Sequence, residues 1–157
     1  TVKFGLPLGN TSGGTSGRLQ TGDGEFNQIL RLDASSGFQL KKVGAYVSTY
    51  AAYNNRTNGF SDEFRFGAEV GAGFFDQKLY TIFRLYGVRS FNNGNREQIA
   101  SNTSIFADGA EHLTFSPEIA YSINDKWGVS ANYAVALSGK LIFADPAYSV
   151  GVFFKLK

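Results

Sequence analysis

The chain has 157 residues, of which 43% are hydrophobic and 15% aromatic, with 19 glycines, no cysteine and a formal net charge of +2. The small net charge and the scattered basic residues exclude an extended nucleic-acid surface. The absence of cysteine excludes a disulfide framework and thiolate chemistry. No run approaches the roughly 20 apolar residues of a membrane helix. A β-barrel remains compatible with this composition, because it pairs its backbone between strands and crosses a bilayer with half of its residues polar.

Apolar and polar side chains alternate with a period of two in eight segments, most clearly in residues 63 to 75. Such alternation is typical of strands with one apolar face. It predicts one all-β domain over residues 1–157, an antiparallel up-and-down transmembrane β-barrel of eight strands. Because Thr1 already stands in a strand pattern, the alternative is the C-terminal part of a larger barrel. The expected strands cover roughly 2–8, 26–34, 40–53, 63–75, 78–91, 112–123, 127–138 and 147–156.

The connections between these segments alternate in length. Tight turns are expected near Ser35–Gly37, Asp76–Gln77 and Asn124–Lys126. The longer connections, about 9–25, 54–62, 92–111 and 139–146, are rich in Asn, Gly, Ser and Thr, which favours solvated loops. Outer-membrane barrels combine short periplasmic turns with longer outer loops. This alternation therefore predicts that both chain ends lie on the periplasmic side.

The polar face of the strands carries mostly Gly, Ser, Ala and Tyr with a few charges of both signs, which suits a crowded interior better than a solvated surface. The apolar face is therefore expected to contact lipid. Aromatic side chains on that face should form two girdles at the membrane interfaces. The outer girdle comprises Tyr53, Phe64, Phe91, Phe115 and Tyr148, and the periplasmic girdle Phe4, Phe74, Tyr121, Trp127 and Phe154.

Hairpin arithmetic predicts contacts on the polar face. A two-residue loop at Asp76 and Gln77 sets Glu69 opposite Arg84, and likewise sets Gly67 opposite Tyr86 and Gly73 opposite Tyr80. A turn at 124–126 pairs Glu118 with Asn132. A narrow interior requires such pairing, because an isolated buried charge is costly. The expected lumenal network either braces the barrel or lines a pore, and comprises Arg65, Glu69, Arg84, Glu118 and Asn132.

Other chemistry has little support in the sequence. His112 is the only histidine; Ser116 and Glu118 share its face but belong to no catalytic motif, so no catalytic residue is assigned. Asp23 and Glu25 provide two carboxylates, too few for a calcium site, and their Gly-rich segment favours a turn that orders the first long loop. No metal or cofactor is expected. Pro117 cannot donate to a sheet ladder, which predicts a bulge there.

The last strand, Tyr148–Lys157, resembles the terminal strand of Gram-negative outer-membrane barrels, although it ends in Lys rather than Phe or Trp. Leu6-Pro7-Leu8-Gly9 followed by Thr21–Glu25, and later Ser116–Tyr121, are similar to a group of transporter-like barrels that includes proteins linked to uptake of small hydrophobic compounds. This resemblance implies a place in the bacterial outer membrane, with the bilayer, lipopolysaccharide and envelope proteins as partners. No nucleic acid is among the expected partners.

The function expected from the sequence is that of a passive porin or transporter for small solutes, and not of an enzyme. One alternative is a structural or adhesive barrel, or a subunit of an envelope complex. A closed eight-stranded barrel favours this alternative, because side chains fill its interior. The other alternative is a soluble lipocalin-like carrier, in which the apolar face would line a cup and the charges of residues 63–75 would face water.

Overall fold

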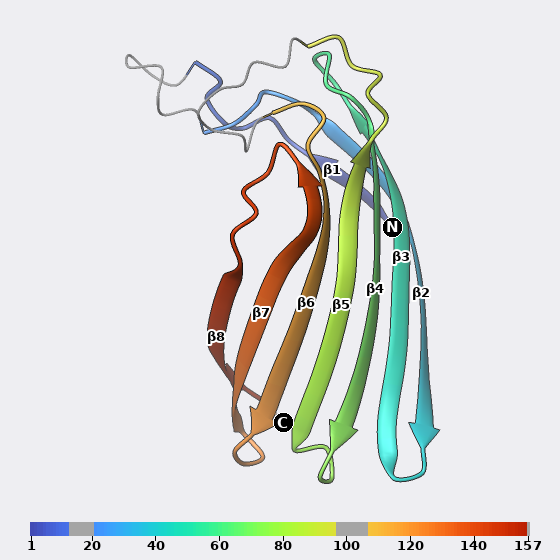
Figure 1. Ribbon diagram of the computed structural model, residues 1–157, viewed down its shortest axis with the longest axis vertical. Coiled ribbons are helices and arrows are strands. Elements are labelled where there is room, and N and C mark those ends of the chain that lie inside the picture. Colours follow the sequence, from blue (N-terminus) through green and yellow to red (C-terminus); the bar gives the residue numbers. More distant parts are fainter. Residues whose placement is uncertain (13–20, 97–106, 157) are drawn as a thin grey trace.

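The computed structural model describes residues 1–12, 21–96 and 107–156. They form one antiparallel sheet in which eight strands follow each other in chain order (Figure 1). All the regular elements of this described part are strands, and none of its segments is a helix that could span a membrane. The strands are β1 (Val2–Gly5), β2 (Asn27–Leu40), β3 (Val43–Arg56), β4 (Glu63–Phe74), β5 (Leu79–Ser90), β6 (Glu111–Ser122), β7 (Trp127–Lys140) and β8 (Ala147–Phe154).

The connections gather at two opposite ends of the curved sheet (Figure 1). The short-turn end carries the connections 41–42, 75–78 and 123–126. The long-loop end carries the described connecting residues 6–12, 21–26, 57–62, 91–96, 107–110 and 141–146. Within the described residues β1 and β8 do not pair with each other, so the sheet is open. The predicted all-β antiparallel order with eight strands is confirmed, whereas closure into a barrel is not observed.

The turn between β2 and β3 is not at Ser35–Gly37, where it was expected, but at Lys41 and Lys42. Ser35 pairs with Ser48 inside the ladder, which continues to the pair Leu40–Val43. Ser35, Ser36 and Gly37 are small enough for a turn but do not require one. The alternation of apolar and polar side chains continues past them through Phe38 and Leu40. The left-handed conformation that the tight turn needs is adopted by Lys41, with φ of 57°.

The N-terminus lies near the long-loop end, which corrects the expectation that both chain ends lie at the short-turn end. β1 has four residues and pairs only with the first residues of β2, from Gly5–Asn27 to Val2–Leu30. The amino group of Thr1 donates to the Arg31 carbonyl at 2.8 Å, and the Arg31 N–H donates to the Thr1 carbonyl at 2.9 Å. The strand expected over 2–8 is therefore shorter than predicted. The other end of the chain agrees with expectation, since β8 reaches the short-turn end.

The predicted hairpin registers are confirmed. Glu69 pairs with Arg84, Gly67 with Tyr86 and Gly73 with Tyr80, although the connection after β4 has four residues rather than two. Glu118 pairs with Asn132.

The predicted bulge at Pro117 is wrong. The β6–β7 ladder keeps one register from Ser122 to Thr114 and shifts only between Thr114 and Leu113. A proline removes one donor but adds no residue, whereas a bulge needs an extra residue on one strand. At this position the Asn132 side chain donates instead to the Pro117 carbonyl, at 3.0 Å.

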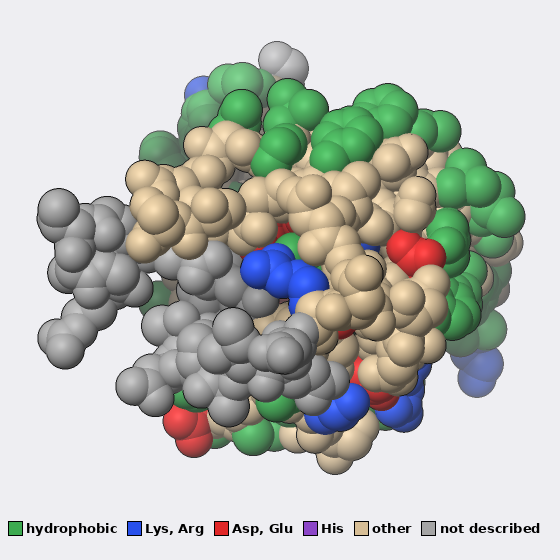
Figure 2. All heavy atoms as spheres, turned by 90° about the horizontal axis from the view of Figure 1, so that it is seen from above, with side chains coloured by type: hydrophobic (Ala, Val, Ile, Leu, Met, Phe, Trp, Pro, Cys, Tyr) green, Lys and Arg blue, Asp and Glu red, His purple; other side chains and the backbone are tan. Residues whose placement is uncertain are grey.

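The two faces of the sheet differ sharply in chemistry. Large apolar side chains on the outer, convex face are exposed, from Phe74 at 36% to Val150 at 89%. Figure 2, seen from the long-loop end, shows hydrophobic side chains along much of the outer rim, with charged side chains in the middle of the view and at its edge. Among the described residues only two hydrophobic side chains, Ala52 and Phe60, are buried. The sheet therefore has almost no apolar core.

Candidate functional site

One arginine on the inner face is shared by two carboxylates. Arg84 on β5 forms ion pairs with Glu69 on β4 and, at 2.5 Å, with Glu118 on β6. Tyr46 on β3 donates its hydroxyl to the second oxygen of Glu69, at 2.5 Å. The side chains of Arg84, Glu69 and Glu118 are 31%, 28% and 23% exposed. Tyr46, Glu69, Arg84 and Glu118 thus form a half-buried network across four strands, here called the Arg84 network.

The alternation within each strand and the register between strands build this network. Glu69 stands directly opposite Arg84, so the two side chains meet on the same face. Glu118 is two residues from Ser116, which is the partner of Arg84 on β6. Such a diagonal neighbour is within reach of a long side chain. Both ion pairs join residues that the sequence placed in one network.

Two other residues assigned to the network from the sequence have different partners. Asn132 lies opposite Glu118, but its amide donates to Ser116 Oγ at 2.8 Å and to the Pro117 carbonyl. Arg65 points to the inner face closer to the long-loop end, where its guanidinium bonds Glu63 at 2.6 and 2.9 Å. Arg65 therefore lies outside the Arg84 network and pairs with Glu63 instead.

Tyr46 was not identified from the sequence, although the register contains the signal for it. Tyr46 lies opposite Gly71, and its ring covers the space that a side chain at that position would need. In the same way the Tyr50 ring lies over Gly67, where an added Cβ would come within 2.5 Å of it. Large rings facing glycines on the next strand are thus how this inner face is packed.

Two open cavities flank the Arg84 network, and both are lined by Arg84 and Tyr86. The first has a volume of about 270 Å³ and lies toward Arg31, Tyr50 and Glu69. The second has about 430 Å³; its lining includes Ser116, Glu118, Ser130, Asn132 and Ser149. A hollow of about 880 Å³ opens at the short-turn end between Tyr80, Ser122 and Lys155. The inner face is therefore polar and incompletely filled.

A second cluster, which sequence analysis missed, surrounds Arg56 at the long-loop end. Arg56 pairs with Glu25 at 2.5 Å, with Glu63 at 2.7 Å and with Asp108 at 3.7 Å. These four side chains are each at most 9% exposed, and we refer to them as the Arg56 cluster. The alternation places Arg56 and Glu63 on the inner face, but Glu25 and Asp108 come from connections that were expected to be solvated.

The segment before β2, where the sequence favours a turn, contains a local hydrogen bond. Asp23 Oδ1 accepts a hydrogen bond from the backbone N–H of Glu25 at 3.2 Å. The Glu25 carboxylate is then directed to Arg56 and to the side chain of Asn27.

Asp62, between β3 and β4, hydrogen-bonds both to the end of β3 and to Asn93 in the connection after β5. Its carboxylate accepts hydrogen bonds from the Arg56 backbone N–H at 2.9 Å and from the side chains of Tyr53, Asn55 and Asn93 at 2.7 to 3.2 Å. Partial burial acts to raise the pKa of this carboxyl, but these hydrogen bonds outweigh burial and hold the pKa below its ordinary value of 3.8.

This depressed pKa predicts how the loop contacts depend on pH. The contribution of Asp62 to folding is present above the ordinary carboxyl pKa and is lost as the pH falls through the lower pKa of the folded state. A carbon-13 NMR titration of the Asp62 carboxyl should therefore give a midpoint below 3.8. The Asp62→Ala variant should show faster hydrogen exchange at the backbone N–H of Arg56, which donates to the Asp62 carboxylate at 2.9 Å. A midpoint at or above the ordinary value would contradict the assignment.

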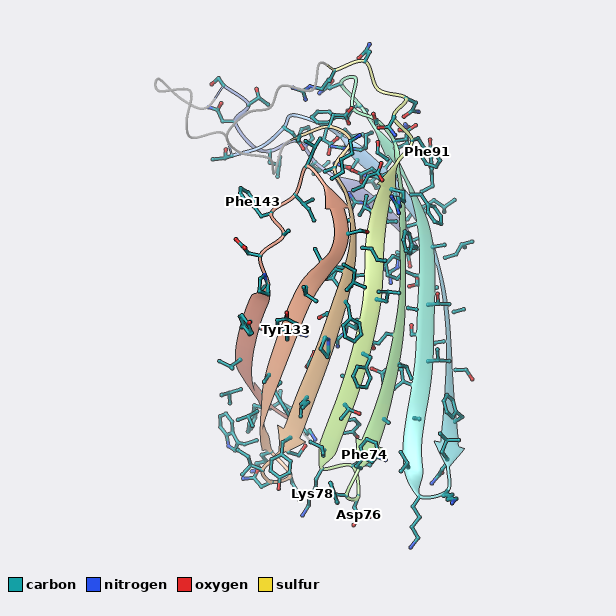
Figure 3. The ribbon with its side chains drawn as sticks, viewed as in Figure 1. Phe74, Asp76, Lys78, Phe91, Tyr133 and Phe143 are labelled. Atoms are coloured by element: carbon teal, nitrogen blue, oxygen red, sulfur yellow. The ribbon has the colours of Figure 1, made fainter. Side chains whose placement is uncertain are left out.

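Aromatic side chains of the outer face occur at both ends and also between them (Figure 3). Tyr53, Phe64 and Phe91 lie at the long-loop end, where the rings of Tyr53 and Phe91 are 5.8 Å apart. Phe74, Tyr121, Trp127 and Phe154 lie at the short-turn end, where the rings of Trp127 and Phe154 are 4.8 Å apart.

Three aromatic positions differ from the expected girdles. Phe4 lies at the long-loop end because β1 pairs with the start of β2. Phe115 and Tyr148 pair with Leu85 and Tyr133, near the middle of β5 and β7. β8 begins only at the level of the middle of β7. Tyr148, at the start of β8, is therefore far from the long-loop end, where the outer girdle was expected.

The arrangement around His112 does not resemble a nucleophilic site. Its imidazole packs edge-on against Tyr86, with centroids 6.2 Å apart. The Ser116 hydroxyl accepts its hydrogen bond from Asn132, and Glu118 is paired with Arg84. In the part of the chain that the structure describes, no three His, Cys, Asp or Glu side chains are placed to hold a metal ion.

Comparisons of the chain with protein-family models, with curated proteins and with solved structures found no match. The functional argument therefore depends on the geometry of the sheet.

Proposed function

We propose that this protein is a bacterial outer-membrane β-barrel through which small solutes pass passively. The observation that carries the proposal is the inverted distribution of side chains. Only Ala52 and Phe60 are buried hydrophobic residues in the described part, while side chains such as Leu32 and Val152 are each 72% exposed. Burial of apolar area is the dominant favourable term in folding in water, and this sheet buries almost none. Contact of the outer face with lipid would remove that apolar area from water.

The two sheet edges also favour a membrane barrel over an isolated sheet. The side of β2 that faces away from β3 is paired only as far as Arg31, and β8 pairs only with β7 among the described residues. Unpaired backbone groups cost several kcal/mol each in hydrocarbon, so lipid-exposed open edges do not occur there. The proposal therefore includes pairing of both edges in the membrane.

The inner face supports passage rather than a filled interior. The cavities of about 270 and 430 Å³ flank the Arg84 network, and a larger hollow opens at the short-turn end. Polar side chains and backbone line the first two, including Ser48, Ser130 and Ser149. Such a lining can replace part of the hydration of a small polar solute.

The second candidate is a structural or adhesive barrel without transport. The pairing of Arg84 and Arg56 with carboxylates favours this second candidate, because paired charges can also hold the strands of a non-conducting barrel together across its interior. The lipocalin-like carrier is less well supported. That reading requires Phe64 and Val70 inside a cup, and these side chains are 40% and 44% exposed on the outer face.

Single-channel recording of the refolded protein in planar bilayers tests the proposal. We expect discrete conductance steps, which Ser130→Trp should reduce because Ser130 lines the second inner cavity. Ala131→Trp is the matched control, since the adjacent residue points to the outer face and is exposed. A silent wild-type protein would favour the non-conducting barrel, and an equal effect of the two tryptophans would contradict passage along the inner face.

A further inference from the structure

The Arg56 cluster brings together segments that are distant in sequence. Glu25 comes from the connection before β2, Asp108 from the connection before β6, and Arg56 and Glu63 stand at the facing ends of β3 and β4. The guanidinium of Arg56 is thus the common partner of three carboxylates from three separate parts of the chain. Two long connections are therefore attached to the sheet by one side chain.

A second set of contacts joins the connection between β3 and β4 to the connection before β6. Ser61 donates its backbone N–H and its hydroxyl to the Asp108 carboxylate, each at 2.8 Å. The N–H of Gly94 donates to the Ser61 hydroxyl at 3.0 Å. Phe60 is 4% exposed and lies between two guanidinium groups, those of Arg56 and Arg96, at 4.5 and 4.1 Å from its ring centroid.

The cluster covers the inner face at the long-loop end. Arg56 lies in the same inward row of β3 as Asn54 and Ala52, which are 0% and 4% exposed. Further along the inner face, the side chains of Glu69 and Arg84 are 28% and 31% exposed. The inner row is therefore closed off at the long-loop end and becomes accessible toward the middle of the strands.

We propose that the Arg56 cluster is a latch that holds the long connections over the inner face and controls the access of solutes from the long-loop end. This inference deepens the proposed transport function and rests on it. The covering segments, 21–26, 57–62 and 107–110, lack strand pairing, so they can move while the sheet persists. Loss of Arg56 leaves three carboxylates in a buried site without their common cation, which favours the state in which they reach water.

Cysteine labelling measures the latch directly. The chain contains no cysteine, so Ala52→Cys places a single thiol beneath the cluster. In detergent micelles, a water-soluble maleimide should modify this thiol slowly in the otherwise unchanged protein. Addition of Arg56→Gln should accelerate labelling by about tenfold or more, because the rate follows the population of the open state. Phe60→Ala should also accelerate labelling, and it leaves every carboxylate of the cluster paired.

Controls separate opening of the latch from general unfolding. Arg89→Gln breaks the ion pair with Glu111 at the same end of the sheet, but Arg89 is 63% exposed and lies outside the cluster. It should leave the labelling of Ala52→Cys unchanged. A thiol introduced by Lys42→Cys, at an exposed position of the short-turn end, should react at the same rate in all backgrounds. Unchanged labelling beneath the cluster in both Arg56→Gln and Phe60→Ala would overturn the latch.

Conductance then tests whether the latch acts on transport. Arg56→Gln and Phe60→Ala should increase the conductance step in planar bilayers, whereas Arg89→Gln should not. Faster labelling with unchanged conductance of a conducting protein would overturn control of access. Silence of every variant, with labelling still accelerated, would reject the proposed transport function and leave the latch as a property of the fold.

Discussion

Replacing Val70 with arginine should lower the free energy of unfolding in lipid vesicles by about 2–4 kcal/mol, the cost of a cationic side chain at the middle of a bilayer. Val70 is 44% exposed on the outer face and lies between Val47 and Phe83 on the neighbouring strands. All three positions are away from both ends of their strands. Urea unfolding followed by tryptophan fluorescence provides the measurement, since Trp127 is the only tryptophan of the chain.

The matched control is the same substitution at the edge of the proposed bilayer. Val43 begins β3 beside the exposed Lys42 and shares the outer face with Val47. Near an interface an arginine costs about 0–1 kcal/mol, so Val43→Arg should be much milder than Val70→Arg. Equal costs at both positions, or no cost at Val70, would contradict lipid contact on this face.

The order and facing of the strands could be predicted because both depend on local patterns. A period of two fixes which residues share a face, and a hairpin fixes the register, so the sequence alone places Glu69 and Arg84 together. The β2–β3 turn could not be located in this way. Ser35, Ser36 and Gly37 are suitable for a turn, but they are equally compatible with the extended strand that the structure contains.

The Arg56 cluster shows where reasoning from local patterns fails. Alternation places Arg56 and Glu63 on the inner face, but it says nothing about the side chains of long connections. Glu25 and Asp108 lie in Gly- and Asn-rich segments whose composition favours solvated loops, and yet they are buried against Arg56. A buried guanidinium needs anionic partners. That requirement is a tertiary one, which no repeat along the chain reveals.

Loss of Arg84 alone should destabilise the protein more than loss of the whole ion-pair network. Arg84→Gln leaves the carboxylates of Glu69 and Glu118 close together in a half-buried site without their common cation. We expect the free energy of unfolding to fall by about 2–3 kcal/mol. The triple variant Glu69→Gln, Arg84→Gln, Glu118→Gln removes every charge at once and should cost less. Removal of Glu69 and Arg84 together should fall between them, since Glu118 alone remains unpaired.

The order of these three costs tests the network. If the charges contact one another, the single variant is the least stable; if the side chains contribute only packing, the loss of stability increases with each further substitution. Urea unfolding in the same vesicles gives the three values. The pair of Arg89 and Glu111 is the control, because the Arg89 side chain is 63% exposed at the long-loop end, outside the Arg84 network. Arg89→Gln should cost about 0–1 kcal/mol, as surface ion pairs usually do. If the triple variant were the least stable, the three side chains would contribute packing rather than charge balance to the inner face.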